Sequence, residues 1–263
     1  FEEAAKFRAA RRLWARLVEE RFDPDDPAST QLKFHTQTGG STLTAQQIEN
    51  NVVRVAYQAL AAVLGGTQSL HTNGKDEALA LPTEESVRTA LRTQQILAHE
   101  SGAADTIDPL AGSYYVESLT DELEAAARDI VEEVDRRGGA LAAIESGWVE
   151  RQIQDVAFER QREIEAGERV IVGVNAFEAD EEPEMDLEAV DPEREAAQRE
   201  RLAAVKRDRD DAAVDDALNA VRAAARGDDN VLPPILEAVK AYATVQEISD
   251  VFRDEFGEYT PNR

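Results

Sequence analysis

Two short runs of sequence decide the expected fold: residues 31–40, Gln-Leu-Lys-Phe-His-Thr-Gln-Thr-Gly-Gly, and residues 66–74, Gly-Thr-Gln-Ser-Leu-His-Thr-Asn-Gly. Each contains a strand-like segment, at 31–38 and 67–72, that ends at turn-forming residues. Each is followed by a stretch in which apolar residues recur at helical spacing. Repeated strand–helix units of about 35 residues are typical of a parallel sheet with right-handed crossovers. The two runs therefore predict an α/β fold.

Helices are expected around both strands. The helix before the first strand should bury Phe7, Ala10, Trp14, Leu17 and Val18. Thr44 and Gln47 have the spacing of a capping box, so the next helix is expected to begin there and to stop at Gly65 and Gly66. Its apolar positions are Val52, Val53, Ala56, Leu60 and Val63. After the second strand, Thr83 and Ser86 precede a helix with apolar positions Val87, Leu91, Ile96 and Leu97.

The remainder of the chain is mainly helical in pattern. A helix is expected to start near Thr120, with stops at Gly138-Gly139 and Gly147, a helix over 148–166 and a short strand over 170–174. Acidic residues dominate from 178 to 216, which indicates a linker and a solvated helix before two short amphipathic helices. We therefore expect three parts: 1–117 with the strand–helix units, 118–177 as a helical extension, and 178–263 as acidic linker and C-terminal helices.

Composition excludes several classes of function. The 263 residues include 29 basic and 54 acidic ones, for a formal net charge of −25, so binding to nucleic acid or to an anionic membrane is disfavoured. There is no cysteine, which removes disulfides, thiolate metal sites and cysteine nucleophiles. No apolar run is long enough for a membrane span, and the start at Phe1 is unlike a signal peptide and already helical. We expect a cytoplasmic protein whose chain begins inside an element, and its acidic, lysine-poor balance favours a halophilic one.

Polar residues gather where the two strands are expected to end. His35, Gln37, Gln68, His71 and Glu77 should lie at or just past the carboxyl ends, where parallel sheets bind ligands. His35, His71 and Glu77 could in principle form a two-histidine, one-carboxylate metal site. Hydrogen bonding to a ligand or a neighbouring loop is the favoured role, so no metal ligand is predicted.

Other catalytic patterns are weak. Ser41 and Ser69 lack the Gly-x-Ser-x-Gly elbow that exposes a serine nucleophile. Neither GxGxxG nor GxxxxGK[ST] occurs, so no dinucleotide or P-loop site is indicated. His99 lies in a polar stretch and is interpreted as a surface residue.

A set of longer segments resembles one enzyme family over nearly the whole chain. These segments are residues 5–14, 34–46, 50–54, 66–73, 76–83, 108–117, 138–139, 172–175 and 233–240. They are similar to the large (alpha) subunit of methylmalonyl-CoA mutase, in the C-terminal portion of its acyl-CoA-binding barrel domain. The resemblance implies that 32–38 and 67–72 are the seventh and eighth strands of a (β/α)₈ TIM barrel, followed by a mainly helical region.

The family's activity follows from the resemblance as an expectation. The barrel binds acyl-CoA along its axis and adenosylcobalamin on its C-terminal face, and the isomerase interconverts (R)-methylmalonyl-CoA and succinyl-CoA by a radical rearrangement. By resemblance, the residues that contact the cofactor are Gln37, Gly40, Ser41, Glu77 and Ala80. The residues that line the substrate pocket are His35, Gln68, Ser69 and His71. For each of them, packing inside the barrel is the alternative, and no catalytic residue is assigned.

Parts of the family's machinery have no counterpart in this chain. The residues that bind the thioester, the substrate carboxylate and most CoA phosphates belong to earlier strands, so the substrate could also be isobutyryl-CoA or ethylmalonyl-CoA. The Asp-x-His-x-x-Gly motif that ligates cobalt is absent, which implies a small cobalamin-binding subunit as partner. The N-terminal part of the barrel, or a second large subunit, is the other expected partner. We expect the chain alone to be inactive; the second interpretation is a non-catalytic remnant that binds a partner.

Overall fold

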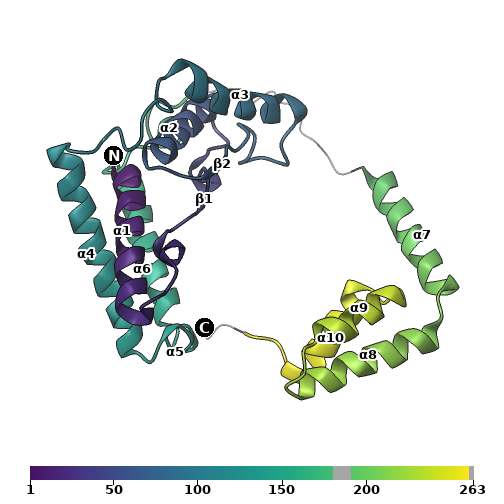
Figure 1. The fold of residues 1–263 in the computed structure, drawn as a ribbon. Coiled ribbons are helices and arrows are strands. Elements are labelled where there is room, and N and C mark those ends of the chain that lie inside the picture. The colour runs from purple at the N-terminus through teal and green to yellow at the C-terminus, as the bar shows by residue number, and fades with distance from the viewer. Residues whose placement is uncertain (180–190, 261–263) are drawn as a thin grey trace. The chain divides into compact units, whose positions relative to one another are not determined.

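The computed structural model describes residues 1–179 and 191–260 in two compact units, Phe1–Glu188 and Ala189–Arg263 (Figure 1). The first unit contains α1 (Glu2–Phe22), η1 (Pro27–Thr30), β1 (His35–Gln37), η2 (Gly40–Thr42), α2 (Asn50–Leu64), β2 (Ser69–His71), α3 (Glu84–Glu100), α4 (Tyr114–Arg136), α5 (Ala140–Glu145) and α6 (Trp148–Glu165). The second contains α7 (Pro192–Asp208), α8 (Asp211–Arg226), α9 (Leu232–Lys240) and α10 (Val245–Phe256). The three-part domain division stays a prediction, and most of its acidic linker lies outside the described residues.

The two strands form a parallel pair. His35 pairs with Ser69 and Gln37 with His71, and α2 makes the crossover between them, which confirms the α/β assignment. In the described ranges the sheet consists of these two strands, so each has one edge without a strand neighbour. A (β/α)₈ barrel needs eight strands, so the barrel itself stays a prediction.

The expected start of α2 at Thr44 is wrong. The helix begins at Asn50, because residues 46–49 form a turn in which Gln47 has a φ of 47°. The Thr44 hydroxyl donates to the carbonyl oxygen of Gln46 at 2.8 Å instead of capping the helix. At α3 the expectation is confirmed, because the Thr83 hydroxyl accepts from the Ser86 N–H.

Two further boundaries differ from the expectation. α4 begins at Tyr114, earlier than the expected start near Thr120. The run 170–174 is not a strand but a turn with one isolated bridge, because the Asn175 side chain bonds the backbone of Ile171 and of Arg169 and curls the segment. The stops at Gly138-Gly139 and Gly147, and the helix that follows them, are confirmed.

The first helices bury many small and polar side chains, and of the large apolar residues that the pattern favoured Val18 is buried while several others are exposed. The buried residues of α1 are Ala4, Ala5, Ala9, Leu13 and Val18; those of α2 are Asn51, Val55, Ala59 and Ala62; those of α3 are Ser86, Ala90 and Thr93. Trp14 is 43% exposed, and Val53, Val87 and Leu91 are exposed as well. Small side chains let these helices approach their neighbours closely, and several of the large ones point outward.

Ion pairs fasten α4 to α1, which lies beside it (Figure 1). Arg8 donates to Glu117 at 2.7 Å, and this hydrogen bond holds the pKa of Glu117 below its usual range. Arg12 and Arg16 both donate to the buried carboxylate of Glu124. The helical extension is thus tied to the strand–helix part by charge as well as by packing.

The second unit has a small core of its own. Val221 of α8, Ala238 of α9 and Val251 of α10 are buried together, which gives the predicted C-terminal amphipathic helices a partner in α8. No residue of α7 is buried, as expected for a solvated helix. None of the helices in the two described ranges is long and apolar enough to cross a bilayer.

A glutamate that is paired with an arginine lies in the first turn of α10. Arg209 donates to both carboxylate oxygens of Glu247 at 2.7 and 2.8 Å, and Glu247 forms a capping box with Thr244. The hydrogen bond from Arg209 lowers the pKa of Glu247 strongly. Because the folded-state pKa is lowered, this stabilisation is present above the ordinary glutamate pKa of about 4.3 and is lost as the pH falls.

We therefore expect the second unit of a Glu247→Gln variant to be less stable at pH 7 and to lose less stability between pH 7 and pH 3 than the wild type. Far-ultraviolet circular dichroism in urea measures this loss. Both tryptophans, Trp14 and Trp148, lie in the first unit, so their fluorescence reports that unit separately. Glu237→Gln is the control, since its pair with Lys240 is exposed. Equal pH dependence in all three proteins would contradict this role of Glu247.

Candidate functional site

The candidate site begins with four exposed side chains on one face of the sheet. His35 and Gln37 of β1 alternate with the inward Thr36, and Ser69 and His71 of β2 are their register partners. Paired residues point to the same side of a sheet, so the four side chains lie together. The Nδ1 atom of His35 lies 2.7 Å from the Ser69 hydroxyl oxygen. The structure thus brings together four residues that the sequence singled out.

Gln68 lies apart from these four. It precedes β2, so the expectation that it lies at the carboxyl end of a strand is wrong. The same expectation is wrong for His35, which is the first residue of β1. Its side-chain oxygen accepts from the Phe34 N–H at 2.8 Å, and its side-chain nitrogen donates to the Gly66 carbonyl oxygen at 2.9 Å. These bonds join the starts of the two strands. Its contact with a substrate stays a prediction.

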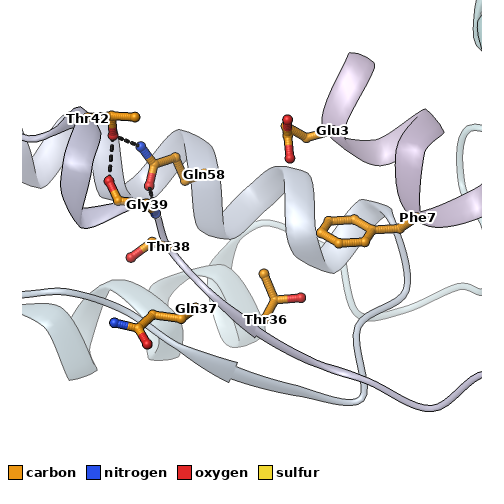
Figure 2. A pocket seen from close by; sticks show the side chains of 8 residues that line it. All are labelled: Glu3, Phe7, Thr36, Gln37, Thr38, Gly39, Thr42 and Gln58. Atoms are coloured by element: carbon orange, nitrogen blue, oxygen red, sulfur yellow. Dashed lines mark hydrogen bonds between the residues drawn. The ribbon is translucent and has the colours of Figure 1, made fainter. Parts of the chain in front are cut away.

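The loop after β1 forms a tight turn over Gly39–Thr42. The Gln58 side chain reaches from α2 to both ends of this turn, accepting from the Gly39 N–H at 2.8 Å and donating to the Thr42 hydroxyl at 2.6 Å (Figure 2). A cavity of about 270 Å³ lies beside it, between α1, β1 and α2. The lining residues are Glu3, Phe7, Thr36, Gln37, Thr38, Gly39, Thr42 and Gln58. Ser41 is exposed within the turn.

Gly40 brings the two loops into contact. A Cβ atom at Gly40 would lie 2.8 Å from Nδ2 of Asn73 and 3.2 Å from Cγ of Glu77, so only glycine fits without a shift. Gln37 donates to Oδ1 of the same Asn73 at 3.1 Å. Three of the predicted cofactor contacts, Gln37, Gly40 and Glu77, therefore meet around one buried asparagine. Ala80 lies further along the second loop and is half-buried.

A fully buried asparagine joins the loop after β1 to the loop after β2. Asn51, near the start of α2, accepts from the Thr44 N–H and donates to the Thr44 carbonyl oxygen and the Lys75 carbonyl oxygen, at 2.8 to 3.1 Å. Thr44 lies in the loop after β1 and Lys75 in the loop after β2. Sequence reasoning missed this residue because it followed apolar spacing alone. A polar residue at helical spacing with Val55 and Ala59 was the available signal.

Other polar groups fix the second loop. The buried carboxylate of Asp76 accepts from the Thr83 N–H at 2.8 Å, which closes the segment that carries Glu77 and Ala80. Its other oxygen is buried without a hydrogen-bond partner among the described residues. Lys75 donates to Glu49 at 2.7 Å, and this bond raises the pKa of Lys75 above its ordinary value.

The turn that follows α6 reaches back to the same loops. Arg54 of α2 donates to the Val172 carbonyl oxygen at 2.7 Å and to Oδ1 of Asn51 at the same distance. Gln47 donates to the Phe177 carbonyl oxygen at 2.9 Å. The helical extension therefore contacts the loops after the strands in addition to contacting α1.

The functional groups at this surface can form hydrogen bonds to a ligand. The exposed groups are imidazole, amide, hydroxyl and carboxylate, suited to hydrogen bonding a large polar ligand. The part of the chain that the structure describes contains no group of three histidine, cysteine or acidic residues placed to hold a metal ion. The fold is α/β, and these polar side chains gather on one face of its parallel strand pair.

Comparison with known proteins gives the family. The family model of methylmalonyl-CoA mutase matches residues 1–258. The large subunit of 2-hydroxyisobutanoyl-CoA mutase from Aquincola tertiaricarbonis is 47% identical over 98% of this chain and 46% of its own length. The methylmalonyl-CoA mutases of Rhizobium meliloti and Escherichia coli are 47% and 46% identical, over 37% and 36% of their own lengths. The chain belongs to the methylmalonyl-CoA mutase family and spans less than half the length of these relatives.

Proposed function

We propose that this chain supplies the seventh and eighth strand–helix units of a (β/α)₈ barrel in an adenosylcobalamin-dependent acyl-CoA mutase. The observation that carries the proposal is the meeting of the two post-strand loops at Gly40, Asn73 and Glu77, within a chain of this family. The unpaired strand edges and the outward apolar side chains of α2 and α3 support neighbours on both sides. The remaining strands would come from a longer polypeptide or a second chain.

The residues present fit a corrin ring. Gly40 and Ser41 offer backbone without bulk, and the glycine is required by its neighbours rather than by a turn conformation. Gln37 and Glu77 supply an amide and a carboxylate for groups at the ring's edge, and Ala80 lies beside them in the second loop. Bound adenosylcobalamin supplies the radical chemistry, with its cobalt ligand on another domain or a small subunit. This chain's residues bind and orient the ring and exclude water.

The substrate is the finer part of the proposal. His35, Ser69 and His71 would line the acyl-CoA pocket, with Gln68 at its far end, and their imidazoles and hydroxyl suit hydrogen bonding to polar groups of the substrate. The proposed reaction is the interconversion of (R)-methylmalonyl-CoA and succinyl-CoA. The 47% identity to a 2-hydroxyisobutanoyl-CoA mutase favours 2-hydroxyisobutanoyl-CoA as the second candidate.

The test is a hybrid mutase in which this chain replaces the matching region of the Rhizobium meliloti enzyme. We expect the hybrid, with adenosylcobalamin, to form succinyl-CoA from methylmalonyl-CoA, and this chain alone to form none. Deletion of the matching region is the control. Turnover of 2-hydroxyisobutanoyl-CoA instead would select the second candidate. A folded hybrid that binds adenosylcobalamin but turns over neither substrate would contradict catalysis and favour the non-catalytic, partner-binding interpretation.

A further inference from the structure

The turn Gly39–Thr42 carries two of the proposed cofactor contacts, and one side chain holds both of its ends. Gln58 accepts from the Gly39 N–H and donates to the Thr42 hydroxyl, which itself donates to the Gly39 carbonyl oxygen at 2.6 Å. Figure 2 shows these three hydrogen bonds among Gly39, Thr42 and Gln58. In the sequence, Gly40 and Ser41 lie between Gly39 and Thr42. The turn is therefore fixed at both ends from α2.

The surroundings make the position of the turn depend on the two hydrogen bonds from Gln58. The cavity of about 270 Å³ lies directly beside Gly39, Thr42 and Gln58, so the turn has space to move on that side. On its other side Gly40 is within contact distance of Asn73 and Glu77. A shift of the turn would therefore alter the contact at which the two loops meet.

Gln58 continues a polar row on α2. Asn51, Arg54 and Gln58 follow at spacings of three and four, so they lie on one side of the helix. Asn51 and Arg54 bond Thr44 at the end of the post-β1 loop, and Gln58 bonds its beginning. One helix thus supports the whole loop through three side chains.

We propose that Gln58 is a positioning residue, which sets the Gly39–Thr42 turn in the place where its backbone meets the cofactor. This rests on the proposed function. Gln58 touches neither ligand; it acts through the Gly39 amide and the Thr42 hydroxyl. Its loss weakens cobalamin binding and leaves acyl-CoA binding by the exposed sheet face largely intact.

The first measurement is hydrogen exchange of the Gly39 amide by NMR, on this chain. We expect Gln58→Ala to make it roughly tenfold faster, since two hydrogen bonds that hold the turn are lost. Gln58→Glu keeps an acceptor for the Gly39 N–H and should retain most of the protection. Gln154→Ala is the matched control, because that glutamine makes one exposed bond on α6.

The second measurement uses the same variants in the hybrid mutase. Gln58→Ala should raise the dissociation constant for adenosylcobalamin about tenfold and the acyl-CoA KM less than about twofold, with rescue by Gln58→Glu. Unchanged Gly39 exchange, or faster exchange with control-like cobalamin affinity, would overturn the proposal. A hybrid that binds no cobalamin with the native Gln58 overturns the proposed function instead; Gly39 exchange then still decides whether Gln58 holds the turn.

Discussion

Replacing Asn51 with alanine is expected to destabilise the first unit by about 4 kcal/mol, because each buried group left without a partner costs about 1–3 kcal/mol. The groups left behind are the N–H and carbonyl of Thr44 and the carbonyl of Lys75. Water cannot reach them easily, since Asn51 and Thr44 are both buried. The loops after both strands should loosen together.

Urea unfolding followed by tryptophan fluorescence measures this effect, because Trp14 and Trp148 both lie in the first unit. Asn50→Ala is the matched control: its side chain makes one partly buried bond, to Gln47 at 2.9 Å, and should cost about 1 kcal/mol. Asn51→Asp keeps the side-chain acceptor and loses both donors. The urea concentration at which it unfolds should therefore lie between those of Asn50→Ala and Asn51→Ala, or below both. If Asn51→Ala and Asn50→Ala unfold at the same urea concentration, Asn51 does not support the loops.

Gly40→Ala is expected to weaken adenosylcobalamin binding by the hybrid mutase roughly fivefold to 150-fold, the range that overpacking costs of about 1–3 kcal/mol give. The added methyl would lie 2.8 Å from the Asn73 amide and 3.2 Å from Glu77, so the two loops must separate. Asn73 is buried and bonded to Thr38, so it yields little. Glu77 is exposed and would move first.

The neighbouring glycine gives a matched control. A Cβ at Gly39 would meet its nearest atom, in Thr42, at 3.5 Å, which is ordinary contact. Gly39→Ala should therefore change the cobalamin dissociation constant by no more than about threefold. Titration of both variants by absorbance gives the two constants. Equal loss in both would show that the loop tolerates no side chain at all, and no loss in either would remove Gly40 from the site.

Local patterns in the sequence predicted the parallel strand pair, the cap at Thr83 and the breaks at Gly138-Gly139 and Gly147. These features depend on neighbours within a few residues, so the sequence carries them directly. The start of α2 at Asn50 was missed because a left-handed Gln47 and a turn intervene. The apolar run 170–174 favours a strand, whereas in the structure the Asn175 side chain bonds the backbone of Ile171 and Arg169 and turns the segment back.

The helix faces show what spacing alone could not decide. Trp14, Val53 and Leu91 were expected in the core, yet these side chains are exposed and small residues are buried beneath them. A helix that packs closely against a neighbouring helix buries the side chains that permit the close approach, here often small ones. Which side of each helix faces its neighbour is a property of the packing. The salt requirement inferred from composition stays a prediction.

The sequence by itself determined the family and the parallel strand–helix–strand unit, because motif identity and the alternation of strand and helix patterns are local. It singled out His35, Gln37, Ser69 and His71, and the register of the two strands placed them on one face. Only the tertiary structure decided that Asn51, Asp76 and Gln58 hold the loops and that Gly40 meets Asn73 and Glu77. Those contacts join residues that lie 7 to 37 positions apart in the sequence, and such separations close only when the chain folds.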